Sequence, residues 1–414
     1  MSHRSGRAGG TVEQEFEVLA RGCVDLIQPA ELIGKLARSR ESRASLRIKL
    51  GLDPTAPDIH LGHTVVLRKM RAFQEMGHEG FLVIGDFTAR IGDPSGRSKT
   101  RPPLSTSEIE ANARTYTEQA FKILDVSRTQ VVFNSEWLDG LRSSDWIFLA
   151  AQYNVARMLE RRDFRQRFES GQPISLHEFL YPLAQAYDSI HLKADVELGG
   201  TDQLFNLNVG RDVMPAYGLE PQVVMTTPLL EGLDGVEKMS KSFGNHVGIQ
   251  EPPLEMFGKL MSISDELMWR YWALLTELSA EEVEGFGKEV ASGRRHPKEM
   301  KAELARRIVS DFHGAEEAER AGEEWRRVFS QHEVPAELPE IRRPCSSEPI
   351  WLPRLLADAG LVKSTSDALR TIRQGGLDVD GTRVEEKPAT LEASRPAVHL
   401  LKFGKRRFLR VIIG

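Results

Sequence analysis

The pattern of apolar positions divides the chain into segments of different character. Over residues 11–47, apolar side chains recur at helical spacing. From residue 48 the pattern alternates, with a strand at 48–52, an amphipathic helix at 64–73 and an apolar strand at 80–85. An unbroken apolar strand is typical of a parallel sheet that is covered on both faces. The pattern therefore predicts a helical N-terminal segment followed by a doubly wound α/β domain.

The rest of the chain is predicted to be mostly helical, with a mixed module at its end. Residues 107–195 read as helices around a short strand near residue 130, and residues 252–329 read as helical and charged. Prolines at positions 335, 339, 344 and 349 mark a linker. The last 64 residues predict a helix at 351–359, a helix ending at Gly375-Gly376, a hairpin turning at Asp380-Gly381 and closing strands.

These segments suggest how the chain divides. A chain of 414 residues can form two to four domains that each bury a core. We expect a helical extension (1–47), an α/β domain (48–246) with a helical insertion (about 125–195), an α-helical domain (247–335), a linker (336–350) and a small α+β domain (351–414).

Composition narrows the class of protein. Hydrophobic residues make up 40% and charged residues 28% of the chain, as in ordinary globular proteins. Cys23 and Cys345 are far apart and lack metal-ligand spacing, so we expect no disulfide framework and a reducing compartment. The polar N-terminus lacks the apolar core of a signal peptide, and no apolar run reaches membrane-spanning length. We therefore expect a cytoplasmic protein without a membrane partner.

Charge is distributed unevenly along the chain. Residues 351–414 carry 12 Lys and Arg against 7 Asp and Glu, a net charge of +5, which leaves −10 on the first 350 residues toward the total of −5. A basic module on an acidic body suggests that the module meets a polyanion such as nucleic acid, although a basic tail can also be solubilising.

The stretch LGLDPTAPDIHLGH, residues 50–63, is the first candidate site. It predicts a strand, a loop and a helix start, where unpaired N–H groups and the helix dipole attract phosphate. His60 and His63 are three positions apart and reach the same side, and Gly62 would let a flat ligand lie against the backbone. The stretch suits a nucleotide, although two histidines at a helix start can also be a surface cap.

A second stretch, EKMSKS at residues 237–242, favours the nucleotide interpretation. Lys238 and Lys241 lie in a loop flanked by glycines, so their ammonium groups can swing onto a polyphosphate and withdraw. Alone, such a loop is usually only solvated. Together, HLGH and KMSKS resemble the two signature motifs of class I aminoacyl-tRNA synthetases, in the right order.

The loop GDFTARIGDPSGRSKTR, residues 85–101, adds charged candidates. Asp93 stands at a backbone turn, where its carboxylate could receive an ammonium group, although Asp before Pro is also a common turn former. Arg97, Lys99 and Arg101 could close over phosphates, or could form a charged loop without a ligand.

Polar side chains in HEFLYPLAQAYDSI form a third candidate surface. His177, Tyr181, Gln185 and Asp188 are spaced to share one helix face, and the apolar residues between them suggest that part of this face lines a pocket. Residues 199–203, GGTDQ, follow shortly afterwards. A glycine turn before a carboxylate suits recognition of ribose hydroxyls.

The motifs GLDPTAPDIHLGH, GDFTARIGDPSG, YPLAQAYD, GGTDQ and KMSKS together resemble those of bacterial tyrosyl-tRNA synthetases, over residues 45–414. YPLAQAYD discriminates, because the related tryptophanyl enzymes lack this helix. The tail resembles the S4 RNA-binding domain of bacterial members. The resemblance implies a Rossmann-like catalytic domain, an α-helical anticodon-side domain and an S4-like domain.

The resemblance also implies roles for individual residues. The residues expected to act on the ATP phosphates during catalysis are His60, His63, Lys238, Lys241, Arg97 and Arg101. Those expected at the tyrosine are Thr88, Asp93, Tyr181, Gln185, Asp188 and Gln203, with Asp188 accepting from the phenol. Those expected around the rest of ATP are Gly51, Asp53, Thr55, Gly62, Gly200, Asp202, Met239 and Ser240.

Two positions depart from the more familiar members of the family. Lys49 stands where they have a tyrosine that also contacts the substrate phenol, and Glu197 stands where they often have glutamine. Which residue, if any, replaces the second phenol contact stays open from the sequence.

The expected function is that of a tyrosine–tRNA ligase, which forms tyrosyl-adenylate from L-tyrosine and ATP and passes tyrosine to the 3′-terminal ribose of tRNA(Tyr). Mg²⁺ is expected with ATP, without a dedicated protein metal site. The family also implies a homodimer through the region of residues 154–159, NVARML. The alternatives are a tryptophanyl ligase, a nucleotidyltransferase with a similar sheet, and an RNA-binding protein that kept the fold.

Overall fold

The computed structural model describes residues 10–54, 58–93, 106–330, 339–385, 389–404 and 407–414. These residues divide into two compact units, Met1–Ala318 and Glu319–Gly414. The boundary falls inside helix α16 (Ala315–Ser330). The boundary expected at residue 246 lies within the first unit and stays a prediction. No helix in the described ranges is long and apolar enough to cross a membrane.

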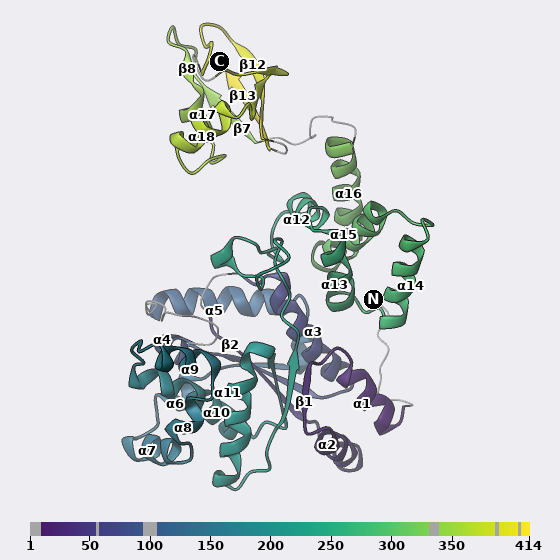
Figure 1. Cartoon of the computed structure of the whole chain (residues 1–414), viewed down its shortest axis with the longest axis vertical. Helices are drawn as coiled ribbons and strands as arrows, with labels where there is room; N and C mark the ends of the chain where they lie inside the picture. The colour runs from purple at the N-terminus through teal and green to yellow at the C-terminus, as the bar shows by residue number, and fades with distance from the viewer. Residues whose placement is uncertain (1–9, 55–57, 94–105, 331–338, 386–388, 405–406) are drawn as a thin grey trace. The chain divides into compact units, whose positions relative to one another are not determined.

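The first unit is built on a six-stranded sheet with the order β1-β6-β5-β2-β3-β4. The strands are β1 (Asp25–Ile27), β2 (Arg47–Leu52), β3 (Glu79–Ile84), β4 (Thr129–Phe133), β5 (Val196–Gly200) and β6 (Val223–Thr227). All neighbours pair in parallel except β1, which is antiparallel to β6. Helices cover both faces, which confirms the expected doubly wound α/β architecture (Figure 1).

The connections across this sheet create a switch point. From β2 the chain crosses through α3 (Leu61–Glu75) to β3, whereas from β5 it crosses through α11 (Leu204–Val213) to β6 on the other side. Neighbouring strands whose connections leave in opposite directions open a crevice at their carboxyl ends. The fold therefore predicts a ligand site beyond Leu52 and Gly200.

The N-terminal segment differs from its helical prediction. It forms α1 (Val12–Ala20) and α2 (Pro29–Ser42), but between them lies β1, the edge strand of the sheet. A strand of three residues is too short to show a periodic pattern. Its conformation follows from the backbone groups of β6, which β1 pairs with in a register of Leu26 against Met225.

Helices fill the interval between β3 and β5. They are α4 (Thr88–Ile91), α5 (Thr106–Ala120), α6 (Ser135–Leu138), α7 (Ser143–Ala151), α8 (Val155–Met158), α9 (Arg162–Glu169) and α10 (Leu180–Leu192). Tyr181, Gln185 and Asp188 share α10, as predicted. His177 does not, because it lies in the preceding 3₁₀ turn (Leu176–Phe179) and is exposed. The polar stripe therefore has three members.

After β6 the chain becomes helical, as its pattern indicated. The elements are α12 (Pro253–Met261), α13 (Asp265–Leu275), α14 (Ala280–Ala291), α15 (Pro297–His313) and α16. Trp272 of α13 and Leu304 of α15 are fully buried. Serine side chains at positions 264 and 279 cap the N-termini of α13 and α14.

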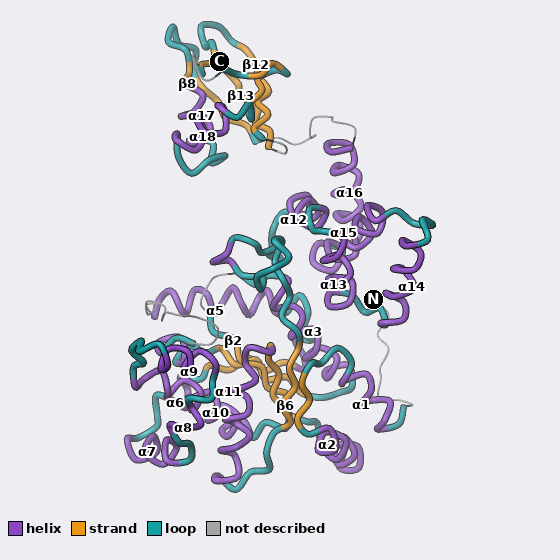
Figure 2. The backbone as a smooth tube through the Cα atoms, viewed as in Figure 1, coloured by secondary structure: helices purple, strands orange, loops and turns teal. Residues whose placement is uncertain are grey.

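The second unit contains a five-stranded sheet with the order β10-β9-β12-β13-β7 and two helices (Figure 2). Its elements are β7 (Glu340–Arg343), β8 (Ile350–Trp351), α17 (Leu352–Asp358), α18 (Thr365–Arg373), β9 (Leu377–Val379), β10 (Thr382–Arg383), β11 (Thr390–Leu391), β12 (Ala397–Phe403) and β13 (Arg407–Ile413). The hairpin turns at Asp380-Gly381 with positive φ at both residues, which confirms the predicted turn.

The segment predicted as a linker, residues 336–350, is in part structured. Residues 331–338 lie outside the described residues, but β7 pairs in parallel with β13 and Ile341 packs on the core of the second unit. The prolines dominated the sequence pattern, and a strand of four residues with only one apolar side chain gave no signal against them.

Candidate active site

A cavity of about 530 Å³ lies at the switch point, beyond the carboxyl ends of β2 and β5. It is lined by every described residue predicted for the site: Gly51, Asp53, His60, Gly62, His63, Thr88, Asp93, Tyr181, Gln185, Asp188, Gly200, Asp202, Gln203, Lys238, Met239, Ser240 and Lys241. Thr55, Arg97 and Arg101 lie outside the described residues. Segments up to about 190 positions apart in the sequence thus meet around one space.

Asp188 lines this cavity and is 3% exposed. Trp137 Nε1 donates to its Oδ1 at 2.8 Å, and Asn134 Nδ2 donates to its Oδ2 at 3.3 Å. Burial raises the pKa of Asp188 to about 6, although the Lys49 ammonium group and the two donors oppose this rise. A carboxylate whose oxygens have one donor each can accept a further donor from a ligand.

Neither of these donors was predicted from the sequence. Asn134 directly follows β4, and a polar residue at the carboxyl end of a parallel strand is a signal that could have indicated it. Trp137 comes from the short helix α6, and its sequence position gives no comparable signal. Asn134 also donates to Thr88 Oγ1 at 3.2 Å, so it links Asp188 to the next group of polar residues.

Asp53, Tyr181 and Thr88 form that group. Tyr181 donates its hydroxyl proton to Asp53 Oδ2 at 2.9 Å, and Thr88 donates to Asp53 Oδ1 at 2.8 Å. A Cβ at Gly85 would lie 2.0 Å from Asp53 Oδ1, so this arrangement requires glycine there. Burial and the nearby Asp93 carboxylate raise the pKa of Asp53 to about 7. Asp53, which the resemblance assigns to ATP, therefore contacts two residues that it assigns to tyrosine.

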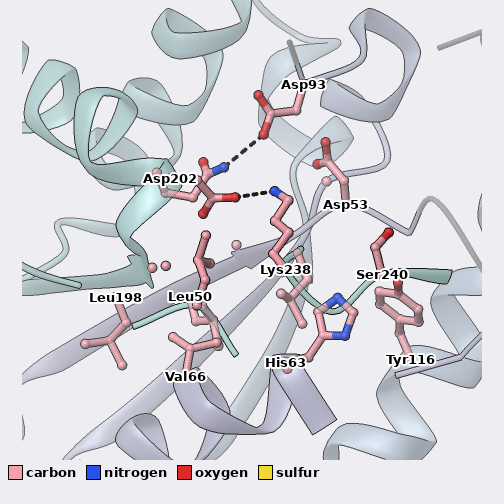
Figure 3. A pocket seen from close by; sticks show the side chains of 18 of the residues that line it. Leu50, Asp53, His63, Val66, Asp93, Tyr116, Leu198, Asp202, Lys238 and Ser240 are labelled. Carbon is pink, nitrogen blue, oxygen red and sulfur yellow. Dashed lines mark hydrogen bonds and ion pairs between the residues drawn. The ribbon is translucent and has the colours of Figure 1, made fainter. Parts of the chain in front are cut away.

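Asp93 joins the same region through Gln203. Gln203 Nε2 donates to Asp93 Oδ2 at 2.9 Å, and Asn206 Nδ2 donates to Gln203 Oε1 at 3.2 Å, which fixes the orientation of the Gln203 amide. Figure 3 shows the side chains of Asp93 and Asp53 near one another at the cavity. Two carboxylates here create a site that suits a cationic group.

His60 and His63 cap the N-terminus of α3. The His60 ring accepts from Gly62 N at 3.2 Å, and the His63 ring accepts from His60 N at 3.3 Å, in both cases through Nδ1. Both rings therefore carry a proton on Nε2 and can donate it. Burial lowers the pKa of both, that of His63 to about 4, so both are neutral near pH 7.

The role expected for Gly62 stays a prediction. A Cβ at this position would lie 3.0 Å from the His60 ring and 3.5 Å from Met239 Cβ, so the packing of the helix cap by itself already favours glycine here. Gly51 also lines the cavity, and a Cβ there would meet no described heavy atom within 4 Å.

The two loop lysines each face a carboxylate. Lys238 Nζ lies 2.8 Å from Asp202 Oδ2 (Figure 3), and Lys241 pairs with Asp58. The loop between them is held by Ser240 N, which donates to Asn245 Oδ1 at 2.8 Å, and by Met239 N, which donates to Leu230 O at 2.7 Å. Asp58 was not predicted, because a pairing across 183 positions leaves no local signal.

Comparisons with known proteins found a matching family model and relatives of similar length. The family model described as "tRNA synthetases class I (W and Y)" matches residues 41–330. The tyrosine–tRNA ligase of Oleidesulfovibrio alaskensis is 52% identical over 402 residues, which cover 97% of this chain and 99% of the relative. That of Ralstonia nicotianae is 54% identical over 399 residues, covering 96% of this chain and 100% of the relative.

Solved structures share the fold. A C-terminally truncated mitochondrial tyrosyl-tRNA synthetase from Aspergillus nidulans aligns with a TM-score of 0.64 at 22% identity, over 78% of this chain and 95% of that one. The tyrosyl-tRNA synthetase of Archaeoglobus fulgidus, solved with L-tyrosine, aligns with a TM-score of 0.59 at 23% identity, over 75% of this chain and 100% of that one.

Proposed function

This chain belongs to the class I tyrosyl-tRNA synthetases, and from that membership we propose how its cavity holds tyrosine and ATP. The chain is an ATP-dependent ligase that joins tyrosine to tRNA. The proposal concerns which residues carry out the reaction. The observation that carries it is the single cavity in which residues of all five motifs meet.

We propose that the substrate phenol donates to Asp188. In support, Asp188 is a buried carboxylate that lines the cavity, and its two protein donors leave lone pairs for a third. Phenylalanine would enter the same space without a donor and leave the buried carboxylate short of a partner. A site built to bind a hydroxyl group is known to reject the analogue that lacks it, and this enzyme family is the standard example, with a ratio of about 10⁵.

The opposite end of the amino acid would lie at Tyr181, Gln185 and Asp93. The hydroxyl of Tyr181 donates to Asp53, so its oxygen can still accept from an ammonium group. The Asp93 carboxylate, held by Gln203, would supply the negative charge. Gln203 would also border the reacting carboxylate, and Thr88 would line the pocket between the two ends.

Adenylation would need alignment and hydrogen-bond donors rather than a base. The tyrosine carboxylate is ionised at neutral pH and attacks the α-phosphorus of ATP directly. The Nε2 protons of His60 and His63 and the ammonium groups of Lys238 and Lys241 would donate to the phosphates as charge moves onto pyrophosphate. Arg97 and Arg101 remain candidates to close over the phosphates.

The remaining ATP contacts are proposed from the cavity wall. Gly51, Gly62, Gly200, Asp202, Met239 and Ser240 line it, and Asp202 would accept from the ribose hydroxyls once Lys238 turns to the phosphates. Thr55 stays a candidate from the resemblance. Mg²⁺ would be held mainly by the phosphates and water.

Tyrosine binding near pH 7 should release protons. The pKa of Asp53 is raised to about 7, so a large share of this carboxyl is protonated near pH 7. An ammonium group in the same region favours the charged carboxylate, lowers its pKa and expels the proton. Calorimetry of tyrosine binding in buffers of different ionisation enthalpy should give a release of a fraction of a proton at pH 7, which declines as the pH rises and Asp53 is already ionised before binding. Proton uptake at pH 7 would contradict this arrangement.

We also propose that the protein is a homodimer through the surface around α8 and α9. Val155 and Phe168 are 61% and 65% exposed and line an apolar hollow with Leu159 and Phe179. Met158, which lies in the same segment, is buried in the core, because the short helix α8 turns it inward.

The variant Val155→Asp should reduce the mass measured by light scattering from two chains to one, because a carboxylate would be buried against apolar groups. Val126→Asp, at an equally exposed valine outside this surface, should leave the mass unchanged. A single-chain mass for the unaltered protein would contradict the dimer.

The second unit is proposed to bind tRNA(Tyr). Exposed arginines such as Arg354, Arg370 and Arg383, together with the positive net charge of residues 351–414, support a contact with phosphates. A cytoplasmic location is proposed with it, supported by the free state of Cys23 and Cys345.

A further inference from the structure

Lys49 and Glu197, the two departures from the familiar sequence pattern, are partners. They face each other across the parallel pair of β2 and β5. Lys49 Nζ lies 2.8 Å from Glu197 Oε1, and the two side chains are 0% and 1% exposed. A substitution of either residue alone would leave a buried charge without its partner. The two positions therefore form a single structural feature.

This pair is hydrogen-bonded to two residues of α10, one before and one after Asp188. Lys49 Nζ donates to Gln185 O at 2.7 Å and to Ser189 Oγ at 2.8 Å. Glu197 accepts from Gln185 Nε2 at 3.1 Å and from Ser189 Oγ at 3.0 Å. Asp188 lies between the two bonded residues. Its position against the sheet is thus set by four hydrogen bonds from one ion pair.

Stability alone does not account for such a pair. Removing two charges from water is unfavourable, and apolar residues of similar size often replace a buried ion pair without loss of stability. The pair instead places a lysine cation against Ser189, the residue that directly follows Asp188. We propose that Lys49 and Glu197 are positioning residues for substrate recognition, which hold α10 in register and keep a positive charge beside the Asp188 carboxylate.

The charges around Asp188 predict the direction in which each substitution should shift the pKa of this carboxylate. The Lys49 ammonium group lowers the pKa of Asp188, and the Glu197 carboxylate raises it. Removing Lys49 should therefore make Asp188 harder to ionise, and removing the charge of Glu197 should make it easier. A purely structural role would move the pKa of Asp188 in the same direction in both variants, or not at all.

Other titratable groups face the same region and must be separated from this effect. Asp53 and Tyr181 interact with Asp188 electrostatically from the ammonium side of the cavity. Asp93 acts on both of those groups. From α6, Trp137 is a neutral donor, and the His191 ring stacks on it at 4.5 Å between centroids. A measurement that reports only the phenol end is therefore needed.

Binding of L-tyrosinol and L-phenylalaninol provides this measurement. The two ligands share the ammonium group and differ in the phenol hydroxyl, so groups at the ammonium end affect both and cancel in the ratio of dissociation constants. The inference rests on the proposed role of Asp188, because the ratio should fall when this carboxylate is protonated. For the unaltered protein we expect the ratio to fall as the pH drops through about 6.

The fall of this ratio with decreasing pH is called the pH limb. The variants Lys49→Met and Glu197→Gln should move the pH limb in opposite directions. For K49M the limb should move to higher pH, so the preference for tyrosinol measured at pH 6 should fall on the order of tenfold. For E197Q the limb should move to lower pH. The matched control is Lys35→Met, which removes another buried lysine, 2% exposed, that pairs with a carboxylate, Asp195, at the amino end of β5. Its limb should stay in place.

The outcomes distinguish the role of the Lys49–Glu197 pair from the proposed recognition of the phenol by Asp188. Limbs of K49M and E197Q that coincide with that of the unaltered protein would overturn the role of the pair. Should K49M fail to fold, E197Q alone decides. Asp188→Asn should abolish the pH limb and the preference for tyrosinol; if it keeps both, the proposed phenol site itself is wrong.

Discussion

Replacing Asp188 with alanine is expected to lower kcat/KM for tyrosine in pyrophosphate exchange by about 10³-fold or more. The reason is that the phenol loses a charge-assisted hydrogen bond in a buried site, and Trp137 Nε1 and Asn134 Nδ2 lose their acceptor as well. KM for ATP should change little, because the donors proposed for the phosphates lie at the start of α3 and in the loop of residues 237–242.

The matched control for this variant is Asp139→Ala. Asp139 is 51% exposed and pairs with Arg90 on the surface, so its loss should leave exchange unchanged. If Asp188→Ala folds and keeps tyrosine exchange within tenfold of the unaltered protein, Asp188 is not the phenol acceptor.

Replacing Lys238 or Lys241 with alanine should lower kcat for adenylate formation by about 10²–10³-fold, the usual effect of removing one donor to a developing charge. Both ammonium groups face the cavity, where Asp202 and Asp58 hold them until phosphates arrive. Because these lysines should act on the transition state, tyrosine binding measured without ATP should be unchanged. Stopped-flow measurement of adenylate formation separates the two quantities.

Lys288→Ala is the control, since Lys288 is 72% exposed and pairs only with Glu284 among the contacts described for it. An equal loss in tyrosine affinity and in kcat for the Lys238 variant would contradict a role confined to the phosphates. It would point instead to collapse of the loop that Asn245 and Met239 hold.

Local chemistry explains which parts of the fold could be predicted. The apolar run that became β3 and the Asp380-Gly381 turn each depend on neighbouring residues, and both were predicted correctly. The strands β1 and β7 could not be predicted, because each has three or four residues and gains its conformation from a distant strand. Their sequence carries no period of its own.

The same distinction holds for the cavity. The residues of HLGH, YPLAQAYD and KMSKS could be selected because each motif is contiguous and contains several polar or charged side chains within a few positions. Their partners Trp137 and Asp58 could not, because these residues reach them only through the fold. Asn134 had a weaker signal, its place directly after a parallel strand. Lys49 and Glu197 were visible as two unexplained positions, and only the register of β2 against β5 makes them one pair.

Amino-acid-dependent exchange of labelled pyrophosphate into ATP tests the central claim most directly. Each of the twenty amino acids is tested separately, without tRNA, so that only activation in the cavity is measured. We expect exchange with tyrosine alone, since its phenol alone combines the right length with a donor for Asp188. Exchange with tryptophan instead of tyrosine, or with no amino acid at all, would contradict this claim.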